Sequence, residues 1–333
     1  MKAVGYYKSL PIAHAESLLD LDAPEPQPGP RDLLVEVKAV SVNPVDAKMR
    51  MRAQGEPAIL GWDAAGVVRS AGAEASLFKP GDEVFYAGAI NRPGANSEMH
   101  VVDERIVGRK PANLSFAEAA ALPLTAITAW ELLFDRLGVP RDGGDGQSLL
   151  IIGGAGGVGS ILIQLARQLT KLTVIATASR SETAEWCRDL GAHHVINHAQ
   201  PMAPQLASVG LGEVNLIAAL TQTPAHWPAF PEIIAPQGKI CVIDDMPSLD
   251  VTPFKRKSVS VHWEFMFTRS LFTTPDMIEQ HNLLDEVARL VESGVLKTTF
   301  GEHYGRINAE NLKRAHALIE SGGAMGKIVL EGF

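Results

Sequence analysis

The feature that most constrains the fold is a glycine-rich turn that directly follows a short apolar segment. Residues 149–152 read Leu-Leu-Ile-Ile, glycines at 154, 156 and 159 complete the pattern G-x-G-x-x-G, and apolar residues at helical spacing follow over 161–169. A turn without Cβ atoms bends tightly and lets the backbone approach a pyrophosphate. The helix N-terminus adds free N–H groups. The pattern predicts a dinucleotide site formed by Gly154, Ala155, Gly156, Gly157, Val158 and Gly159. A glycine turn that serves packing alone is the alternative.

The end of the second predicted strand indicates which dinucleotide would bind. Sites for NAD usually place Asp or Glu there, where the carboxylate holds the adenosine ribose hydroxyls. The expected acidic position falls near Ala178 in this chain, and Ser179 and Arg180 follow it. A guanidinium beside a hydroxyl suits a ribose 2′-phosphate, which it binds through charge-assisted hydrogen bonds. We therefore predict NADPH as the cofactor. An ordinary solvated arginine at a helix start is the alternative.

Short apolar runs alternate with helical patterns from residue 148 onward, and this rhythm defines the fold class. Strands that alternate with helices in this way predict an α/β domain with a doubly wound (Rossmann) parallel sheet. The candidate strands are 149–152, 172–176, 194–196, 214–219, 239–243 and 259–261.

The first third of the chain has a different pattern, with short strand-like runs separated by turns. Part of 33–40 alternates at a period of two, and 61–70 and 84–87 look similar. Alternation of this kind is typical of half-buried strands, so we expect a β-rich, partly open barrel. Near the end of the chain we expect helices that open at Thr274 and Asn308, and then a strand at 327–330. The expected domains are 1–125, 126–267 and a C-terminal segment, 268–333, that returns to the first domain.

Composition excludes several classes of protein. The 333 residues are 46% hydrophobic, and 38 acidic against 30 basic residues give a net charge of −8. This mildly acidic balance does not favour nucleic-acid binding. The two cysteines, Cys187 and Cys241, are too few for a disulfide framework or a four-cysteine zinc lobe. The first residues lack a signal sequence, and no run of 18 apolar residues predicts a membrane span. We expect a cytoplasmic protein.

Further motifs along the whole chain resemble those of the medium-chain dehydrogenase/reductase superfamily, and most closely its quinone-oxidoreductase (zeta-crystallin-like) branch. More narrowly, two segments resemble a bacterial subgroup commonly named zinc-type alcohol dehydrogenase. The resemblance implies that the β-rich domain is GroES-like and that the protein is a homodimer. The superfamily motifs are 42–46, 61–66, 79–84, 154–159 and 190–192, and the subgroup segments are 253–258 and 262–269.

The resemblance also tests whether a catalytic zinc is present. Zinc-dependent members place ligands at positions that hold Asn43, Trp62 and, approximately, Leu124 in this chain. None of these is a usual zinc ligand, and a zinc site needs three or four. The three histidines within 193–198 fall on the third predicted strand and its exit, where successive side chains alternate faces. We predict no metal site.

Without a metal, the resemblance points to hydrogen-bond donors near the substrate. Asn43 is expected to donate its amide N–H to a carbonyl or ribose oxygen, and the alternative is that it only ties its own loop together. Asp46 is expected to be an orienting acceptor. Trp62 is expected to fill the volume of the lost ligand and to form an aromatic floor for a flat substrate, with a purely core role as the alternative.

By resemblance, other residues would contact the cofactor or substrate. Thr128 matches a threonine near the nicotinamide, and His198 replaces a tyrosine near the adenosine phosphate. Lys327 is expected to reach the pyrophosphate, or else to be an edge-strand charge. The segment that borders the nicotinamide ring is expected to be Phe265, Met266 and Phe267, with strand-end packing as the alternative, and Ile243 completes the expected cofactor contacts.

These observations predict an NADPH-dependent oxidoreductase that reduces quinones, enones or other activated carbonyl compounds without zinc. Hydride transfer is the chemistry of the cofactor, and the protein positions the two reactants. Two alternatives remain open: a zinc-dependent alcohol dehydrogenase, and an NADPH-binding structural or sensor protein with little turnover. The expected partner is a small electrophilic carbonyl or quinone molecule.

Overall fold

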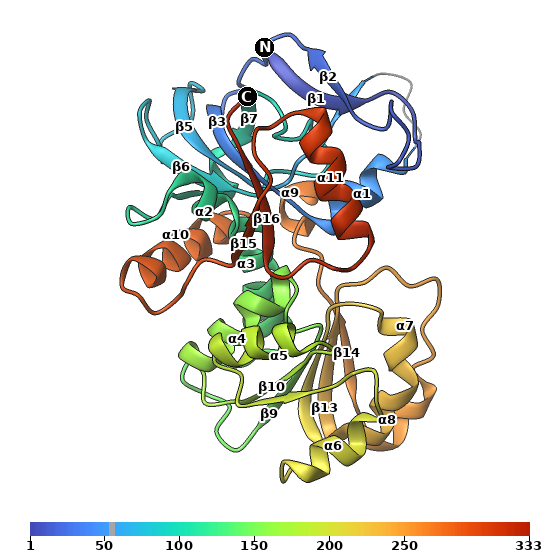
Figure 1. Ribbon diagram of the computed structural model, residues 1–333. Coiled ribbons are helices and arrows are strands. Elements are labelled where there is room, and N and C mark those ends of the chain that lie inside the picture. The colour runs from blue at the N-terminus through green and yellow to red at the C-terminus, as the bar shows by residue number, and fades with distance from the viewer. Residues whose placement is uncertain (53–56) are drawn as a thin grey trace. The chain divides into compact units, whose positions relative to one another are not determined.

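The computed structural model describes residues 1–52 and 57–333, and Figure 1 labels the helices and strands. The chain divides into two compact units. Unit 1 comprises Met1–Ile127 together with Phe267–Phe333, and unit 2 comprises Thr128–Met266. The glycine-rich turn lies in unit 2, whereas Asn43, Trp62 and Lys327 lie in unit 1.

Unit 2 is built around a parallel sheet with the strand order β11-β10-β9-β12-β13-β14. The chain enters at β9, moves outward to β11, and crosses back to β12, so the order reverses beside β9. This topology confirms the predicted doubly wound sheet. The strand predicted at 239–243 begins earlier, because Ile234 already pairs with Val214 before a bulge. The strands are β9 (Ser148–Ile152), β10 (Thr173–Thr177), β11 (His194–Ile196), β12 (Val214–Ala219), β13 (Ile234–Val242) and β14 (Ser260–Trp263).

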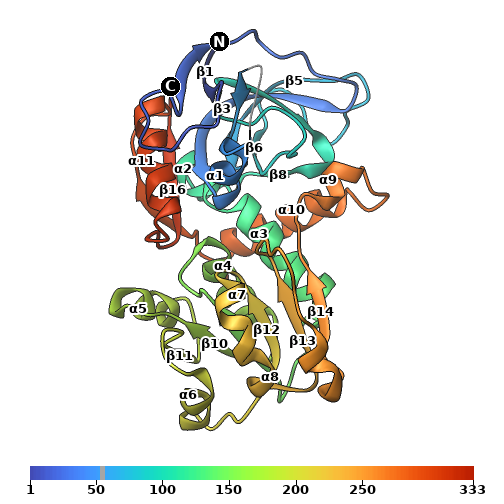
Figure 2. The same cartoon turned by 90° about the vertical axis from the view of Figure 1, so that its right-hand side faces the viewer.

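Helices cover both faces of this sheet, which is why its central strand β9 is buried throughout without alternation. Leu150 packs in a core cluster with Leu206 of α6 and Phe230 of α8. Its neighbour Leu149 points the opposite way and is also fully buried, and α4 packs against β9 and β10. Figures 1 and 2 show these elements. The helices are α4 (Gly157–Leu169), α5 (Ser181–Asp189), α6 (Met202–Ser208), α7 (Thr223–His226), η3 (Trp227–Ala229), α8 (Phe230–Ile233) and η4 (Thr252–Lys257).

Unit 1 is organised around the long strand β3, as expected for a β-rich domain. Its described strands form one sheet with the order β15-β16-β3-β5-β6-β8, in which β7 also pairs with β3, and a second sheet, β2-β1-β4. The strands are β1 (Lys2–Tyr6), β2 (Leu19–Asp22), β3 (Asp32–Val42), β4 (Ala58–Ile59), β5 (Ala64–Ala71), β6 (Glu83–Tyr86), β7 (Met99–Asp103), β8 (Val107–Arg109), β15 (Phe300–His303) and β16 (Lys327–Glu331).

The carboxyl end of β3 brings distant parts of unit 1 together. Val42 lies opposite Ile328 of β16, and the Ser41 N–H donates to the Asp63 carbonyl just before β5 at 3.1 Å. The next residue, Asn43, is the N-cap of α1 (Pro44–Arg50). Two segments from the first fifth of the sequence and one from its end therefore meet at one junction.

A largely buried helical run leads from unit 1 into unit 2. It contains α2 (Phe116–Ala120), α3 (Pro123–Trp130) and the π-helical turn η2 (Glu131–Arg136). Ser115 and Glu118 form a capping box at its start. By length and composition this run is apolar enough to cross a membrane, but 78% of its most apolar window is buried within the protein. Burial of that kind is typical of a core helix.

The last helices differ in how well their starts could be predicted. The Asn308 side chain caps α11, as predicted, by accepting from the Asn311 N–H at 2.9 Å. The helix expected to open at Thr274 begins at Glu279, because residues 274–278 form turns in which the Met277 N–H donates to the Thr274 carbonyl at 3.0 Å. The remaining helices are η1 (Glu104–Ile106), α9 (Thr268–Phe272), α10 (Glu279–Glu292) and α11 (Ala309–Glu320).

Candidate functional site

The glycine-rich turn is held to the end of the neighbouring strand by Thr177. The Gly153 N–H donates to Thr177 Oγ1 and the Gly154 N–H to the Thr177 carbonyl, each at 3.0 Å. Gly153 has a φ of +86°, which a residue with a side chain rarely adopts. The turn is therefore fixed by backbone conformation and by β10 before any ligand arrives.

The glycines of the motif are required for different reasons. A Cβ on Gly159 would lie 2.3 Å from the Gly153 carbonyl oxygen, and one on Gly154 would lie 2.8 Å from the Ala176 Cβ. Close packing within the protein therefore explains both. A Cβ on Gly156 would meet only the Gly153 carbonyl oxygen, at 3.6 Å, an ordinary contact. Packing does not require a glycine at 156, and the backbone there leaves room for a ligand to approach.

The start of α4 offers unpaired backbone donors next to Gly156. This residue is the N-cap of a 13-residue helix and supplies no side-chain cap. The first N–H groups of a helix lack partners within the helix and attract anions. The turn therefore fits the pyrophosphate of a dinucleotide, with Gly154 to Gly159 as the cradle.

The residues expected at the adenosine end lie at the same edge of the sheet. Ser179 and Arg180 are exposed just after β10, and the Arg180 N–H donates to Thr183 Oγ1 at 3.3 Å at the start of α5. His198 Nδ1 lies 3.1 Å from Thr177 Oγ1, and burial lowers the pKa of His198. No acidic residue follows the strand directly where an NAD site would place one, since Ala178 occupies that position.

The other expected cofactor residues of unit 2 follow β13 and β14. Ile243 is half-buried, and its N–H donates to the Ala219 carbonyl at 3.2 Å. Phe265 is 46% exposed and Met266 is buried. Thr128 is buried in α3. The carboxyl ends of parallel strands form the usual ligand edge of such a sheet, and residues 243 and 265 follow the strands at that edge.

Unit 1 contains a junction cluster of four buried polar residues: Asn43, Asp46, Asp63 and Lys327. Lys327 Nζ lies 3.0 Å from Asp63 Oδ2 and also donates to Asn43 Oδ1. Asn43 Nδ2 donates to Asp63 Oδ2 at 2.8 Å and to the Trp62 carbonyl at 3.1 Å. The cluster connects the carboxyl end of β3, the amino end of β16 and the segment just before β5.

This geometry contradicts two of the expected roles. Asn43 is 1% exposed and donates both amide hydrogens inside unit 1, so it is not a free donor for a substrate oxygen. It ties its own region together, which was the alternative. Lys327 is 3% exposed and donates to the Val42 carbonyl as well as to Asn43. It is neither an edge-strand charge nor free to reach a pyrophosphate.

Sequence reasoning missed Asp63, the anion at the centre of this cluster. Besides Lys327 and Asn43, its carboxylate accepts from the Leu124 N–H at 2.7 Å. Burial raises the pKa of Asp63, and these partners act to lower it. The signal was the motif Gly-Trp-Asp, in which Asp63 stands where zinc members carry Glu.

Asp46 accepts a hydrogen bond inside the cluster. Its Oδ2 accepts from the Asn43 N–H at 2.6 Å and completes the capping box of α1. Burial raises the pKa of Asp46 to about 7, while the Asn43 N–H and the charge of Lys327 oppose the shift. The carboxyl therefore titrates near neutral pH inside the cluster.

The three positions of the zinc ligands do not fit a zinc ion. The Trp62 ring is 2% exposed, donates from Nε1 to the Ala89 carbonyl at 3.2 Å and packs edge-to-face on Phe267 at 6.3 Å. It fills the core, so the expected aromatic floor for a substrate is not formed. Phe267 is likewise 2% exposed, and its contact with Trp62 lies within unit 1. Leu124 has no ligand atom in its side chain, and Asn43 is fully engaged. Among residues 1–52 and 57–333, no three His, Cys, Asp or Glu side chains gather as a metal site.

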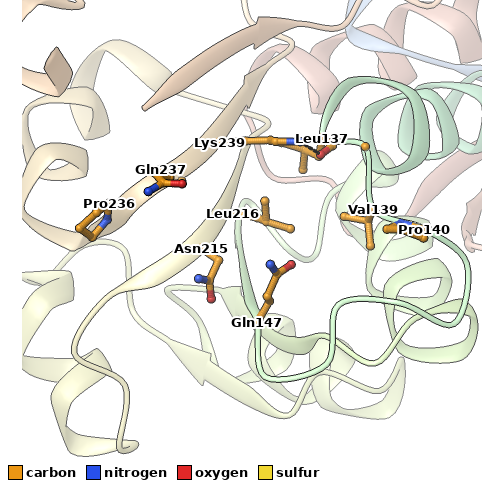
Figure 3. Close-up of a pocket in the computed structure, with 11 residues that line it drawn as sticks. Leu137, Val139, Pro140, Gln147, Asn215, Leu216, Pro236, Gln237 and Lys239 are labelled. Carbon is orange, nitrogen blue, oxygen red and sulfur yellow. Dashed lines mark hydrogen bonds between the residues drawn. The ribbon is translucent and has the colours of Figure 1, made fainter. Parts of the chain in front are cut away.

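A pocket of about 480 Å³ opens elsewhere in unit 2 (Figure 3). Gln147 and Asn215 line it near the amino ends of β9 and β12, and Lys239 donates to the Leu137 carbonyl at 2.7 Å. The glycine turn follows the carboxyl end of β9. The pocket is therefore at the opposite edge of the sheet and is not part of the dinucleotide site.

The parallel sheet with its glycine turn defines unit 2 as a dinucleotide-binding α/β fold, and comparisons place the whole chain. The protein family described as alcohol dehydrogenase GroES-like domain matches residues 29–129, and the family described as zinc-binding dehydrogenase matches residues 190–330. A zinc-type alcohol dehydrogenase-like protein of Staphylococcus aureus (strain MSSA476) is 40% identical over 334 residues, 99% of each chain. The chain belongs to the medium-chain dehydrogenase/reductase superfamily, and its β-rich domain is GroES-like.

Solved structures and a further relative extend this result. A Rhizobium etli protein named as a zinc-dependent alcohol dehydrogenase has a TM-score of 0.96 and 57% identity, covering 100% of this chain and 98% of its own. A mycobacterial protein solved with NADPH has a TM-score of 0.86 and 25% identity over 99% of this chain and 100% of its own. A 2-methylene-furan-3-one reductase of Solanum lycopersicum is 37% identical over 236 residues, 64% of this chain and 58% of that protein.

Proposed function

We propose that this protein is an NADPH-dependent reductase of enones, quinones and other activated carbonyl compounds that works without a catalytic zinc. Membership of the superfamily makes it an oxidoreductase. The proposal that no zinc is used rests on the three positions where zinc-dependent members place metal ligands. At these positions, the Asn43 side chain is hydrogen-bonded to Asp63 and Lys327, and Trp62 and Leu124 offer no ligand atom.

The residues of unit 2 would hold the cofactor. The cradle from Gly154 to Gly159 would bind the pyrophosphate, and Ser179 with Arg180 would bind the 2′-phosphate through charge-assisted hydrogen bonds. When bound, NADPH supplies a hydride to an electron-poor carbon of the substrate. Ile243, Phe265, Met266 and Thr128 are assigned to the nicotinamide end, and His198 to the adenosine end.

The substrate class follows from the missing Lewis acid. A plain alcohol must lose its proton before hydride release, which zinc makes easy near neutral pH. An enone or quinone instead spreads the incoming negative charge over conjugated oxygen and needs less help from the protein. The Solanum relative is named 2-methylene-furan-3-one reductase, and because 2-methylene-furan-3-one is an enone, this name supports the substrate class.

An acceptor panel tests this proposal. NADPH consumption is measured with quinones, enones and simple ketones, and the reverse reaction is measured with ethanol and NADP. We expect turnover of the conjugated acceptors, almost none of ethanol, and no loss of activity after chelation. One tightly held zinc per chain that activity requires would identify a zinc alcohol dehydrogenase instead. Tight NADPH binding without turnover of any acceptor would favour a sensor or structural protein.

A further inference from the structure

The pocket at the amino edge of the unit 2 sheet lies beside an irregularity in β13 (Figure 3). Between two paired positions, Val214 with Ile234 and Leu216 with Lys239, β12 has one residue and β13 has four, 235–238. Extra residues of this kind bulge a strand away from its partner. The adjoining pocket of about 480 Å³ has a volume typical of small-molecule sites.

Lys239 is the only charged residue among the described residues that line this pocket. Its Nζ donates to the Leu137 carbonyl at 2.7 Å and has no second partner in the part of the chain that the structure describes. An ammonium group has three N–H donors, so two of them are available to a ligand. An anion is the ligand that such donors bind most strongly, through charge-assisted hydrogen bonds.

Three carboxamide side chains, those of Gln147, Asn215 and Gln237, also line the pocket. Asn215 Oδ1 accepts from the Ser148 N–H at 2.9 Å, which holds this amide beside β9. The backbone of Gln147 is also held, because its carbonyl accepts from the Thr173 N–H at 2.9 Å. The Gln147 side chain, in contrast, makes no hydrogen bond within residues 1–52 and 57–333. The carboxamides therefore offer donors and acceptors to a polar group of a ligand.

The wall of the pocket between these polar groups is apolar. The lining residues Leu137, Val139 and Leu216 are all buried. In the view of Figure 3, Leu216 lies between Lys239 and Gln147. A matching ligand thus has a negative group at one end, a short apolar body and a polar group at the other end.

Gln237 adopts a conformation that nothing within the fold explains. Its φ is +63°, in the left-handed region that favours glycine. The residue is exposed, and its amide makes no hydrogen bond in the described ranges. Strained residues of this kind cluster at binding sites, where the side chain has a role. The strain at Gln237 is therefore consistent with an amide that contacts a ligand.

We propose that this pocket is a binding site for a small organic carboxylate. The carboxylate accepts from Lys239 Nζ, the apolar body lies over Leu216, and the amides of Gln147, Asn215 and Gln237 bind the polar end. The site is at the edge of the sheet opposite the glycine turn, so its ligand and NADPH bind at the same time. The inference does not depend on the proposed function.

Calorimetric titration of the full-length protein with succinate tests this inference. Succinate has two carboxylates joined by a short apolar chain, succinamide is its neutral counterpart, and inorganic phosphate is an anion without an apolar body. We expect succinate to bind at least about tenfold more tightly than either, because only succinate supplies both the charge and the apolar contact. Its dissociation constant should be the same with and without saturating NADPH.

Variants of the lining residues locate the binding site. Lys239→Met removes the cation and should weaken succinate binding by about tenfold or more. Because Lys239 also holds the Leu137 carbonyl, Gln147→Ala is the second variant, and it should lose affinity while its melting temperature without ligand stays unchanged. Gln237→Gly removes another amide from a position whose backbone suits glycine, and should also lose affinity. Lys255→Met, at an exposed lysine of η4, is the control and should bind as the wild type does.

Each outcome decides the inference. Absence of succinate binding, equal binding of succinamide, or competition between succinate and NADPH overturns it, as does wild-type affinity in both Lys239→Met and Gln147→Ala. Phosphate that binds as tightly as succinate overturns the assignment to an organic carboxylate and leaves an adventitious ion only. None of these results bears on the proposed reductase activity, because the titrations involve no turnover.

Discussion

The glycine-rich turn of unit 2 and the junction cluster of unit 1 use polar groups in opposite ways. In the turn, backbone N–H groups at the start of α4 lack partners within the helix, and Gly156 leaves its surroundings open. In the cluster, Asn43, Asp63 and Lys327 satisfy one another out of contact with water. One region is prepared to receive a ligand, whereas the other holds three distant segments of its own chain together.

Because of this difference, substitutions in the two regions should affect different properties of the protein. Removing a member of the buried cluster leaves an unpaired charge and should reduce the stability of the fold. Altering the open turn should reduce ligand affinity while the fold remains intact. Measuring stability and ligand affinity separately distinguishes these outcomes.

Lys327→Met should cause the largest loss. The substitution keeps most of the apolar stem but leaves Asp63 buried without its cation, which costs about 3–5 kcal/mol of unfolding free energy. Urea denaturation measures this loss, and Lys79→Met, an exposed lysine of the same unit, is the control. A loss no greater than that of the control would mean that the cluster does not stabilise unit 1.

Gly156→Ala should separate affinity from stability. The added Cβ meets only an ordinary contact in the protein, but Gly156 is the N-cap of α4 and alanine is a poorer N-cap than glycine, so the melting temperature should fall slightly. NADPH affinity should fall at least tenfold, about 1.4 kcal/mol, because the methyl group would occupy the approach of the pyrophosphate. Gly212→Ala, where a Cβ meets nothing within 4 Å, is the control. Unchanged affinity in Gly156→Ala would show that the turn serves packing alone.

The same contrast explains what the sequence could predict. The alternating strands and helices of unit 2 and the glycine turn follow from patterns that lie within a few residues of each other, such as Gly154 to Gly159 and the apolar runs around them. The cluster joins Asn43 to Lys327 across 284 residues, and no local pattern encodes that contact. Lys327 was expected to reach a pyrophosphate or to be an edge-strand charge. It instead lies opposite Phe300 of β15, and its side chain contacts Asn43 and Asp63.

Two other differences have local causes. The sequence at Thr274 has the residues of a helix start, but tight turns occupy 274–278 before α10 begins. Trp62 was expected both to fill the volume of the lost ligand and to form a floor for the substrate. The ring does fill that volume, but it is 2% exposed.

Cofactor preference tests the central claim most directly. Titration of NADPH and NADH against the wild-type protein and against Arg180→Ala compares the 2′-phosphate contact alone, since the two cofactors differ only in that group. We expect NADPH to bind at least tenfold more tightly, about 1.4 kcal/mol, and Arg180→Ala to remove most of that difference. Equal affinities of the wild-type protein for the two cofactors would contradict the assignment of this protein as an NADPH-dependent reductase.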